Sequence, residues 1–431
     1  MNLSEKLKTF ISSKQTDNIK INMPVPETGL SRAVDTVLEA TAVKTPFGEH
    51  LIVEKAYPCS YMRGEIKLDS VFNISGEILK LIAKSCDYEG FDFSQAVFID
   101  TETTGLAGGT GTLAFLTGAG FFEKNGFKIL QYFIRDYDEE TAALYSLSSL
   151  LKNFDNIVSF NGKSFDIPLL STRYMLNRIE NPFEKPFHLD LLASARRLYR
   201  ERLESVSLSS LETNLLSLKR EGDIPGYEIP SVYFRFLRDR NPYPLKPIFY
   251  HNRMDILSMV TLTVDMAKSF KAPFDSESCA NQDYYCLGRV YEDMGMTERS
   301  IKCYEQALTV SGVREKSHTQ LSLLFKRLGR WHEAERLWTN MAKGNINTIF
   351  ALVELAKYYE HKLKDYDKAA QVTLKALETV YKRSTFVGYS LKDEIAELKK
   401  RLERIEYKDK RSRDNVQDGK FSDTGQGIRL P

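Results

Sequence analysis

Two acidic side chains, Asp100 and Glu102, stand one residue apart after the apolar residues 97–99 and shortly before Gly105. Alternate residues of a strand share a face, so the two carboxylates are expected on one side, roughly 6.6 to 6.8 Å apart along the strand. Hard cations such as Mg²⁺ or Mn²⁺ prefer oxygen ligands, and two ions about 3.5 to 4 Å apart stabilise both attacking and leaving oxygens in phosphodiester cleavage. The pair therefore points to a nuclease.

A third acidic residue, Asp166, follows a turn signal at Asn161-Gly162 and precedes Pro168. Proline suits the first turn of a helix and biases the residue before it away from helical geometry, so Asp166 is expected where a strand gives way to a helix. For this aspartate alone, a helix cap is the simpler explanation.

A fourth acidic residue, Asp255, lies four positions after His251 in a segment with helical spacing of apolar residues. Side chains four apart share a helix face, so both can reach a common ligand. A surface hydrogen bond between them explains the pair equally well when it is taken in isolation.

Taken in order, the three segments resemble the three motifs of the DEDD, or DnaQ-like, exonuclease superfamily over roughly residues 95–268. The resemblance implies a ribonuclease H-like fold in which Asp100, Glu102, Asp166 and Asp255 bind two divalent metal ions, Mg²⁺ or Mn²⁺. Cleavage would then be a two-metal displacement.

The closing motif departs from both branches of that superfamily, which place a histidine five residues, or a tyrosine four residues, before the last aspartate. Here Tyr250 holds the first position and His251 the second. By its position, His251 is expected to orient or deprotonate the attacking water, because histidine exchanges protons near neutral pH. Tyr250 is expected to pack or to contact substrate.

Further residues narrow the resemblance to a YprB-like subfamily of ribonuclease H-like domains: the glycine-rich residues 107–112, the segment 222–226 and the pair His251-Asn252. The glycine run lacks the ending of a P-loop and is interpreted as a loop at the rim of the site. Asp190 is interpreted as structural. The resemblance implies substrate contacts from Thr103, Thr104, Leu106, Asn161, Phe165 and Tyr250.

The composition limits the class of protein and its cellular location. A chain of 431 residues with 42% hydrophobic and 27% charged residues is typical of a soluble protein of two or three domains. The sequence has no long apolar run that would predict a membrane span. Its N-terminus shows no pattern typical of a secretion signal, so a cytoplasmic location is expected. The five cysteines show no metal-binding pattern and are interpreted as thiols in a reducing compartment.

Charge gives little guidance about nucleic acid, because the formal net charge is only +2. Basic surface must be local. One basic cluster comprises Arg196, Arg197, Arg200 and Arg202. Such clusters are more often solvated helix faces than phosphate-binding tracks.

Strand patterns are expected over residues 96–99, 113–122, 127–134, 157–160 and 187–189, with the first three as a meander and a helix over 139–151. This order predicts an α/β ribonuclease H-like domain over residues 95–270, with a mixed five-stranded sheet flanked by helices. Residues 1–94 are interpreted as an N-terminal extension packed on that domain.

The C-terminal part repeats with a period of thirty-four residues: Leu287, Tyr291 and Gly295 recur as Leu321, Phe325 and Gly329. This is the tetratricopeptide period. A third copy carries a one-residue insertion before Ala369. The pattern predicts an all-α solenoid over residues 280–385 whose concave face binds a protein or peptide partner. Residues 386–431 are expected to form a charged helix and a flexible tail, irregular from about Tyr407.

These patterns predict a metal-dependent 3′–5′ exonuclease acting on single-stranded nucleic acid ends, with no membrane association. Two alternatives remain: a non-enzymatic nucleic-acid-binding adaptor, and a proofreading subunit that works in trans. The residues leave open whether the substrate is DNA or RNA, and whether cleavage begins at an end or inside a structured strand.

Overall fold

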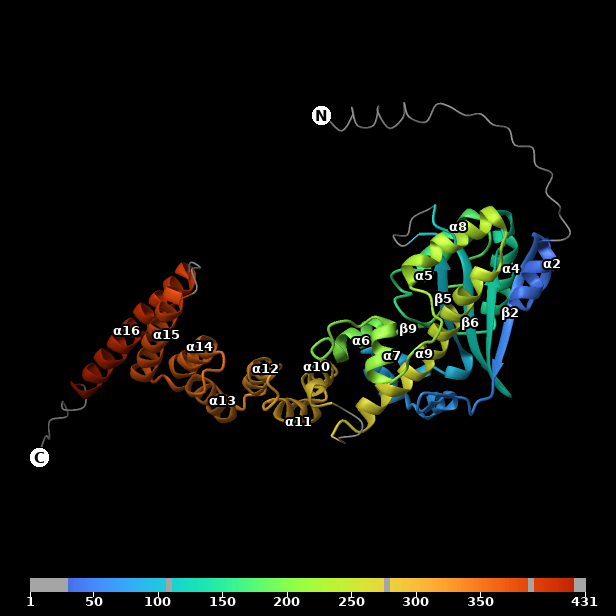
Figure 1. Ribbon diagram of the computed structural model, residues 1–431. Coiled ribbons are helices and arrows are strands. Elements are labelled where there is room, and N and C mark those ends of the chain that lie inside the picture. Colours follow the sequence, from blue (N-terminus) through green and yellow to red (C-terminus); the bar gives the residue numbers. More distant parts are fainter. Residues whose placement is uncertain (1–29, 106–110, 275–279, 387–390, 422–431) are drawn as a thin grey trace, which may run out of the picture.

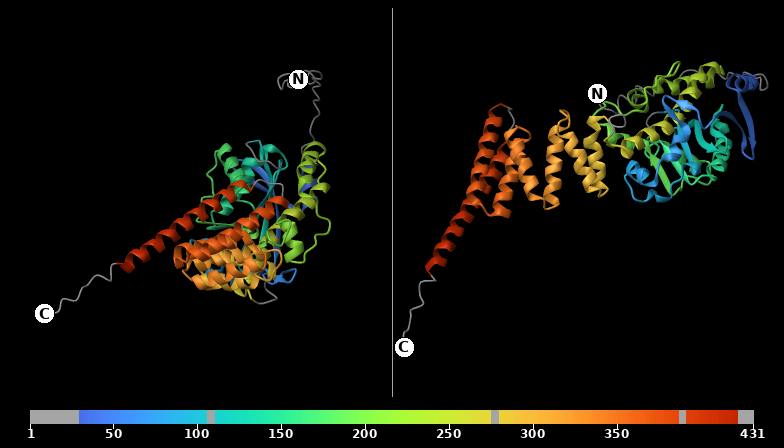
Figure 2. Two further views of the ribbon diagram at one scale, coloured as in Figure 1. Left: turned by 90° about the vertical axis from the view of Figure 1, so that its left-hand side faces the viewer. Right: turned by 90° about the horizontal axis from the view of Figure 1, so that it is seen from below.

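The computed structural model describes residues 30–105, 111–274, 280–386 and 391–421. They form an α/β domain from which an elongated arm of helices extends (Figure 1), as two further directions of view also show (Figure 2). Within those ranges, no helix has both the length and the apolar character needed to cross a membrane. Leu106 and the first twenty-nine residues lie outside the described part of the chain.

The α/β domain is built on one mixed sheet in the order β1-β2-β7-β6-β5-β8-β9. The strands are β1 (Ala40–Thr45), β2 (Gly48–Tyr57), β5 (Ala96–Thr103), β6 (Ala114–Glu123), β7 (Gly126–Phe133), β8 (Asn156–Ser159) and β9 (Phe187–Asp190). Strands β5, β8 and β9 run parallel, whereas β5, β6 and β7 form the expected antiparallel meander. All five strands expected from the sequence are present.

The expected count of five strands was too low, because β1 and β2 from the N-terminal region join the sheet. Strand β2 pairs antiparallel with β7 from Leu51↔Phe133 to Tyr57↔Phe127. Its sequence places charged Glu54 and Lys55 among apolar residues, so the segment lacks a clean strand alternation. A separate hairpin follows, formed by β3 (Met62–Arg63) and β4 (Ile66–Lys67).

Helices cover both faces of the sheet. Successive residues of β5 point to opposite sides and so pack against different helices. Val97 and Ile99 pack among residues of α4 and α5, whereas Ala96 and Phe98 belong to the core that contains α9. The helices of this domain are α2 (Leu30–Leu38), α3 (Gly76–Ala83), α4 (Glu140–Leu151), α5 (Asp166–Leu176), α6 (Leu191–Tyr199), α7 (Leu208–Leu215), α8 (Ile229–Asp239) and α9 (Lys246–Lys271). Short 3-10 turns are η1 (Leu68–Asn73), η2 (Tyr88–Gly90), η3 (Phe93–Gln95), η4 (Tyr137–Glu139), η5 (Gly226–Glu228), η6 (Tyr243–Leu245) and η7 (Asn281–Asp283).

The arm consists of successive helix pairs with the expected tetratricopeptide period. Its helices are α10 (Tyr284–Asp293), α11 (Thr297–Ala307), α12 (Arg314–Arg327), α13 (Trp331–Lys343), α14 (Thr348–Tyr358), α15 (Tyr366–Phe386) and α16 (Lys392–Phe421). Gly295 and Gly329 take φ of +74° and +71° between the helices of the first two pairs, which is the backbone conformation that glycine adopts without strain.

The third repeat absorbs its extra residue in a π-helical turn, η8 (Tyr359–Leu363), directly after α14. A π-turn closes hydrogen bonds from i to i+5, so it takes up one residue more than an α-helical turn. Lys364 then takes the left-handed conformation, with φ of +54°, that glycine takes in the earlier repeats. The insertion inferred from the sequence therefore has a definite structural consequence.

The last helix corrects the expectation of irregular chain from about Tyr407, because α16 continues to Phe421. Ion pairs hold this part of the helix. Lys408 pairs with Glu360 of η8 at 2.8 Å, and Arg413 pairs with Asp409 one turn earlier at 2.8 Å. The charges that suggested a solvated tail therefore have partners on the same helix and on the repeat beside it.

Candidate active site

The sheet presents Asp100 and Glu102 on the face that α9 covers, since they continue the alternation of Ala96 and Phe98. Asp100 is half-buried, and Glu102 is 9% exposed. The pairing of β5 with β6 is irregular between Glu102 and Thr103, where the strand ends. The first motif therefore lies at the end of a central strand, as the sequence suggests.

Two glycines of β6 allow α9 to approach the sheet at this point. Gly118 pairs with Asp100 across the strands, and a Cβ on Gly118 would overlap both Asn252 and Ile256 of α9. Gly120 meets Ile256 in the same way. The close approach brings the third motif directly over the first.

Asn252 fastens α9 to the two strands beneath it and is fully buried. Its Nδ2 donates to the Asp100 carboxylate at 2.8 Å and to the Asp100 carbonyl at 3.2 Å. Its Oδ1 accepts a hydrogen bond from Gln131 Nε2 at 2.8 Å. The sequence singled out Asn252 only as part of a family likeness, whereas the structure makes it the residue that fixes the orientation of Asp100.

The second motif reaches the site from the opposite side of β5. Asn161 adopts φ of +70°, which turns the chain between β8 and α5, and Asp166 is the first residue of α5. The Thr101 hydroxyl donates to Asp166 Oδ1 at 2.5 Å. Asp190 accepts hydrogen bonds from the backbone N–H groups of Asn161, Lys163 and Leu192, in keeping with its interpretation as structural.

His251 lies between two carboxylates. Its Nδ1 is 2.9 Å from Asp223 Oδ1, and its Nε2 is 3.6 Å from Asp255 Oδ2. Asp255 also forms an ion pair with Arg220, whose guanidinium in addition contacts Asp223 at 3.2 Å. Sequence reasoning missed Arg220, which lies in no recognised motif. It gave Asp223 no role of its own, although Asp223 belongs to the segment 222–226 that carries part of the family resemblance.

Arg220 belongs to a buried charge network that extends to the N-terminal hairpin. Glu212 of α7 accepts hydrogen bonds from Arg220 at 2.7 and 2.8 Å and from Arg63 of β3 at 2.8 Å. Ser258 of α9 also donates to Glu212 and accepts a hydrogen bond from Arg63 at 2.8 Å. Buried charges are stable only when they are paired in this way, so the N-terminal region helps to support the site.

Burial raises the pKa of all four predicted carboxyl groups, and the charges of neighbouring carboxylates add to it. The pKa of Asp100 is raised well above its ordinary value, by burial first and then by the charges of Asp255, Glu102 and Asp166. The pKa of Glu102 is raised by burial and then by Asp255. Burial raises the pKa of Asp166 to about 6. Carboxylates that repel one another in this way lie in one electrostatic environment.

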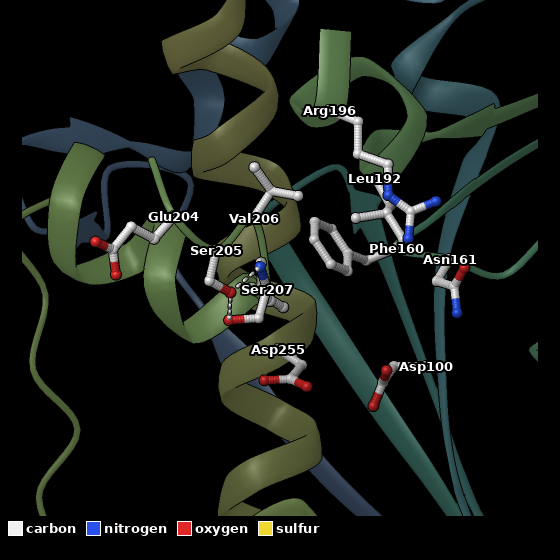
Figure 3. A pocket seen from close by; sticks show the side chains of 11 residues that line it. Asp100, Phe160, Asn161, Leu192, Arg196, Glu204, Ser205, Val206, Ser207 and Asp255 are labelled. Atoms are coloured by element: carbon white, nitrogen blue, oxygen red, sulfur yellow. Dashed lines mark hydrogen bonds between the residues drawn. The ribbon is translucent and has the colours of Figure 1, made fainter. Parts of the chain in front are cut away.

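A cavity of about 570 Å³ opens beside this cluster (Figure 3). Asp100 enters it from β5 and Asp255 from α9, whereas Arg196 approaches from α6. Arg196 is exposed, and it has no hydrogen bond or ion pair within the described part of the chain. The remaining lining comes from the turn after β8, from α6 and from the residues around the start of α7: Phe160, Asn161, Leu192, Glu204, Ser205, Val206, Ser207 and Leu208.

The predicted substrate contacts separate into different environments. Asn161 lines the cavity, but Phe165 and Tyr250 do not, and Tyr250 packs against the core with Arg253 over its ring at 5.9 Å. Thr103 donates to the Gly105 carbonyl at 2.7 Å, and the hydroxyl of Thr104 accepts from the Leu113 N–H at 3.0 Å. The two threonines thus bond to residues at the two ends of the segment that follows β5, Gly105 and Leu113.

The donor set suits a hard divalent cation in atom type and charge, because several crowded carboxylates are each raised in pKa. Within the described ranges, however, no three His, Cys, Asp or Glu side chains are arranged as a ready metal site. Three of the four carboxylates instead have a protein partner: Asn252 for Asp100, Thr101 for Asp166 and Arg220 for Asp255. These partners would have to be exchanged, in part, for a cation.

Comparison with known proteins agrees with this architecture. A model of the RNase_H superfamily matches residues 97–267, and a tetratricopeptide repeat model matches residues 284–312. The "Uncharacterized protein YprB" of Bacillus subtilis (strain 168) is 33% identical over 364 residues, or 81% of this chain and 86% of that protein. The chain belongs to the YprB family.

One solved structure has a weaker likeness. The family B DNA polymerase from the hyperthermophilic archaeon Pyrobaculum calidifontis is 14% identical, with a TM-score of 0.32, over 46% of this chain and 28% of the polymerase. A likeness at this level supports no conclusion about fold or function. The family assignment therefore rests on the YprB relative, and the domain assignment on the two matched segments.

Proposed function

We propose that the chain is a metal-dependent 3′–5′ exonuclease that hydrolyses phosphodiester bonds at single-stranded nucleic acid ends. The observation that carries the proposal is the cluster of mutually repelling carboxylates on three elements: Asp100 and Glu102 on β5, Asp166 on α5 and Asp255 on α9. Concentrated negative charge repels nucleic acid, so a protein that only binds nucleic acid gains nothing from it, whereas a cation-dependent nuclease requires it.

In this proposal, Asp100, Glu102 and Asp255 hold the cations and Asp166 is a further ligand or an anchor for a water molecule. Divalent cations, when bound, supply positive charge to the attacking and leaving oxygens. Asn252 keeps Asp100 oriented through its 2.8 Å hydrogen bond. Because Asp100 and Asp255 come from different elements, the close packing of α9 on β6 sets the distance between them.

His251 acts as the base. Asp223 accepts a hydrogen bond from Nδ1 at 2.9 Å, which leaves Nε2, on the Asp255 side, free to accept a proton from water. Asp223 is therefore a positioning residue. Arg196, on the opposite wall of the cavity, binds a substrate phosphate, because a guanidinium matches phosphate oxygens in charge and geometry.

The partner and the cellular location that we propose follow from the repeats and the cysteines. The repeats bind a protein or peptide partner, as helical solenoids of this type commonly do. Cys59, Cys86 and Cys286 are free thiols, which supports a reducing compartment such as the cytoplasm.

The test follows shortening of single-stranded DNA and RNA of matched sequence, each labelled at the 5′ end, with Mg²⁺ or Mn²⁺ and with chelator. We expect a ladder that shortens stepwise from the 3′ end for one or both substrates. Asp100→Asn and Asp166→Asn should lower the rate by about a thousandfold or more, since each removes a charge that the cations require. Asp138→Asn, at an exposed carboxylate of η4, serves as the matched control.

One observation favours a second candidate, a nucleic-acid-binding adaptor without activity. Asp255 is already paired with the buried Arg220, so one expected ligand is partly neutralised by the protein itself. Binding of oligonucleotides that is independent of metal, with no cleavage under any of these conditions, would favour the adaptor and reject the exonuclease.

A further inference from the structure

A second cavity, of about 240 Å³, lies in the helical arm at the third repeat. It is formed where α13 and α14 meet the π-turn η8 and the last helix, α16. One cation comes from the end of α12. The residues that line it are Lys326, Trp331, Trp338, Glu354, Lys357, Tyr358, His361, Lys362 and Arg401. No proposed role of the nuclease domain uses this cavity.

The cavity contains a buried hydrogen-bond donor without an acceptor. Trp338 is 0% exposed, and its indole N–H has no hydrogen-bond partner among the residues that the structure describes. An indole nitrogen only donates, and a buried donor without an acceptor is costly and rare in folded proteins. Because Trp338 lines the cavity, a ligand there that carries an acceptor oxygen would satisfy it.

Positive charge surrounds this donor. Lys326, Lys357, Lys362 and Arg401 line the cavity, against Glu354 as the one lining carboxylate. Glu354 binds two of the lysines at 2.5 and 2.6 Å, which leaves the cavity with an excess of cations. The ligand should therefore be an anion.

The one-residue insertion of the third repeat supplies part of this site. It forms η8, which carries His361 and Lys362, and it buries Glu360. Glu360 binds Arg401 at 2.8 Å, and so holds α16 against the repeat. The first two repeats lack the π-turn within the described ranges, so the part of the lining that η8 supplies is specific to the third repeat. Single π-turns are frequent at functional sites.

Two features favour a carboxylate over a nucleic acid strand. The donor is fully enclosed, which suits a small group at the end of a side chain better than a continuous phosphate backbone. Trp331 is stacked on Tyr358 at 5.8 Å and also lies under the Lys362 ammonium at 4.7 Å, which leaves little ring surface for a nucleobase.

We propose that this cavity binds an aspartate or glutamate side chain from an acidic segment of a partner protein, with the carboxylate accepting from Trp338 and flanked by Lys362 and Arg401. The site thus gives the arm a definite recognition element, and it does not depend on whether the other domain cleaves nucleic acid.

The chain offers its own reporter for a test. It contains two tryptophans, Trp331 and Trp338, and both line this cavity. The full-length protein is titrated with the peptide acetyl-Gly-Asp-Glu-Leu-Glu-Gly-amide, which has no aromatic residue, while tryptophan emission is followed. We expect a saturable change in emission. The peptide with asparagine and glutamine in place of its acidic residues should give none, because it lacks the charge.

Two variants locate the binding. Arg401→Gln should weaken it about tenfold, since a hydrogen bond to a charged group is lost. Trp338→Phe should weaken it about fivefold and keeps Trp331 as the reporter. Lys400→Gln, adjacent to Arg401 but 71% exposed, is the matched control and should leave binding unchanged. Because Arg401 also binds Glu360, Lys362→Gln, at an exposed side chain that lines the cavity, keeps the test valid even if Trp338→Phe or Arg401→Gln does not fold, and it should also weaken binding.

Three results would overturn the proposal: equal binding of the uncharged peptide, equal weakening by Lys400→Gln and Arg401→Gln, or a saturable response to a single-stranded oligonucleotide but not to the acidic peptide. The last result would assign the cavity to nucleic acid. Asp100→Asn should bind the peptide as the unaltered chain does, so a failure of the nuclease proposal is distinguishable from a failure of this one.

Discussion

The two cavities of this chain are opposite in charge. The cavity of the α/β domain is lined by the carboxylates Asp100, Asp255 and Glu204, with Arg196 as its lining cation, and Arg220 pairs with Asp255 beside it. The cavity of the arm gathers lysines and Arg401, with Glu354 as its partial counter-charge. In each case, the protein's own counter-ions leave an excess of one sign, and that excess indicates the charge of what binds there.

The cavities also differ in how the chain builds them. The acidic cluster joins β5, α5 and α9, which are far apart in sequence, through glycines that allow close packing. The basic cavity forms mainly between neighbouring repeat helices and one inserted residue. Damage to the first should therefore disturb a whole domain, whereas damage to the second should stay within the adjoining repeats.

Among these predictions, the largest difference between the α/β domain and the arm is expected in stability, when a glycine in each is changed to alanine. A Cβ on Gly118 would overlap Asn252 and Ile256, so Gly118→Ala should destabilise the α/β domain by about 3 kcal/mol. A Cβ on Gly288 would lie 2.7 Å from Tyr304 Cε1, so Gly288→Ala should lower the melting temperature of the arm and leave that of the α/β domain unchanged. Calorimetry of both variants separates the effects. Gly111→Ala, with nothing within 4 Å, is the control, and equal stability of Gly118→Ala and Gly111→Ala would refute the close-packing account.

Removal of the buried cation tests the charge balance of the acidic site. Arg220→Gln leaves Asp255 and Asp223 without their counter-charge, so we expect a loss of about 3 kcal/mol without metal. Mg²⁺ should then raise the melting temperature of this variant more than that of the unaltered chain, because a cation replaces the guanidinium. Arg200→Gln, at an exposed side chain, should behave as the unaltered chain. An equal Mg²⁺ effect in all three proteins would show that Arg220 and cations do not share a position.

The smallest effect should come from the cavity wall. Arg196→Gln should raise KM for single-stranded substrate several-fold and leave kcat nearly unchanged, since a phosphate contact contributes to binding in both ground and transition states. Steady-state rates at two salt concentrations measure this, with Arg200→Gln as the control. A fall in kcat at constant KM would instead place Arg196 in the chemical step.

Much of the site could be read from the sequence, because strand alternation and the strand-to-helix turn are local. Asp100 and Glu102 follow the apolar residues of β5, and the residue type of Asn161 alone indicates the turn between β8 and α5. The role of Arg220 could not be predicted, since its partners lie on elements whose spacing in the fold is set by tertiary packing. Strands β1 and β2 escaped notice for a related reason: polar side chains on a strand near the sheet edge mask the alternation.

In the arm, too, the sequence predicts local features but not contacts between distant elements. The insertion in the third repeat is visible as a shift in register at Ala369, but its form, a π-turn that carries Lys362 into a cavity, depends on the contact with α16. Arg401 pairs with Glu360 across forty-one positions, and no repeat period predicts such a contact.

The central claim is that the four carboxylates form one cation-binding cluster. Its most direct test is calorimetric titration of the full-length protein with Mn²⁺, compared with Asp100→Asn, Asp255→Asn and the exposed control Asp138→Asn. The account predicts saturable binding to the unaltered chain and to Asp138→Asn, with affinity lowered at least tenfold in the two site variants. Absence of Mn²⁺ binding to the unaltered chain, or equal binding to all four proteins, would contradict it.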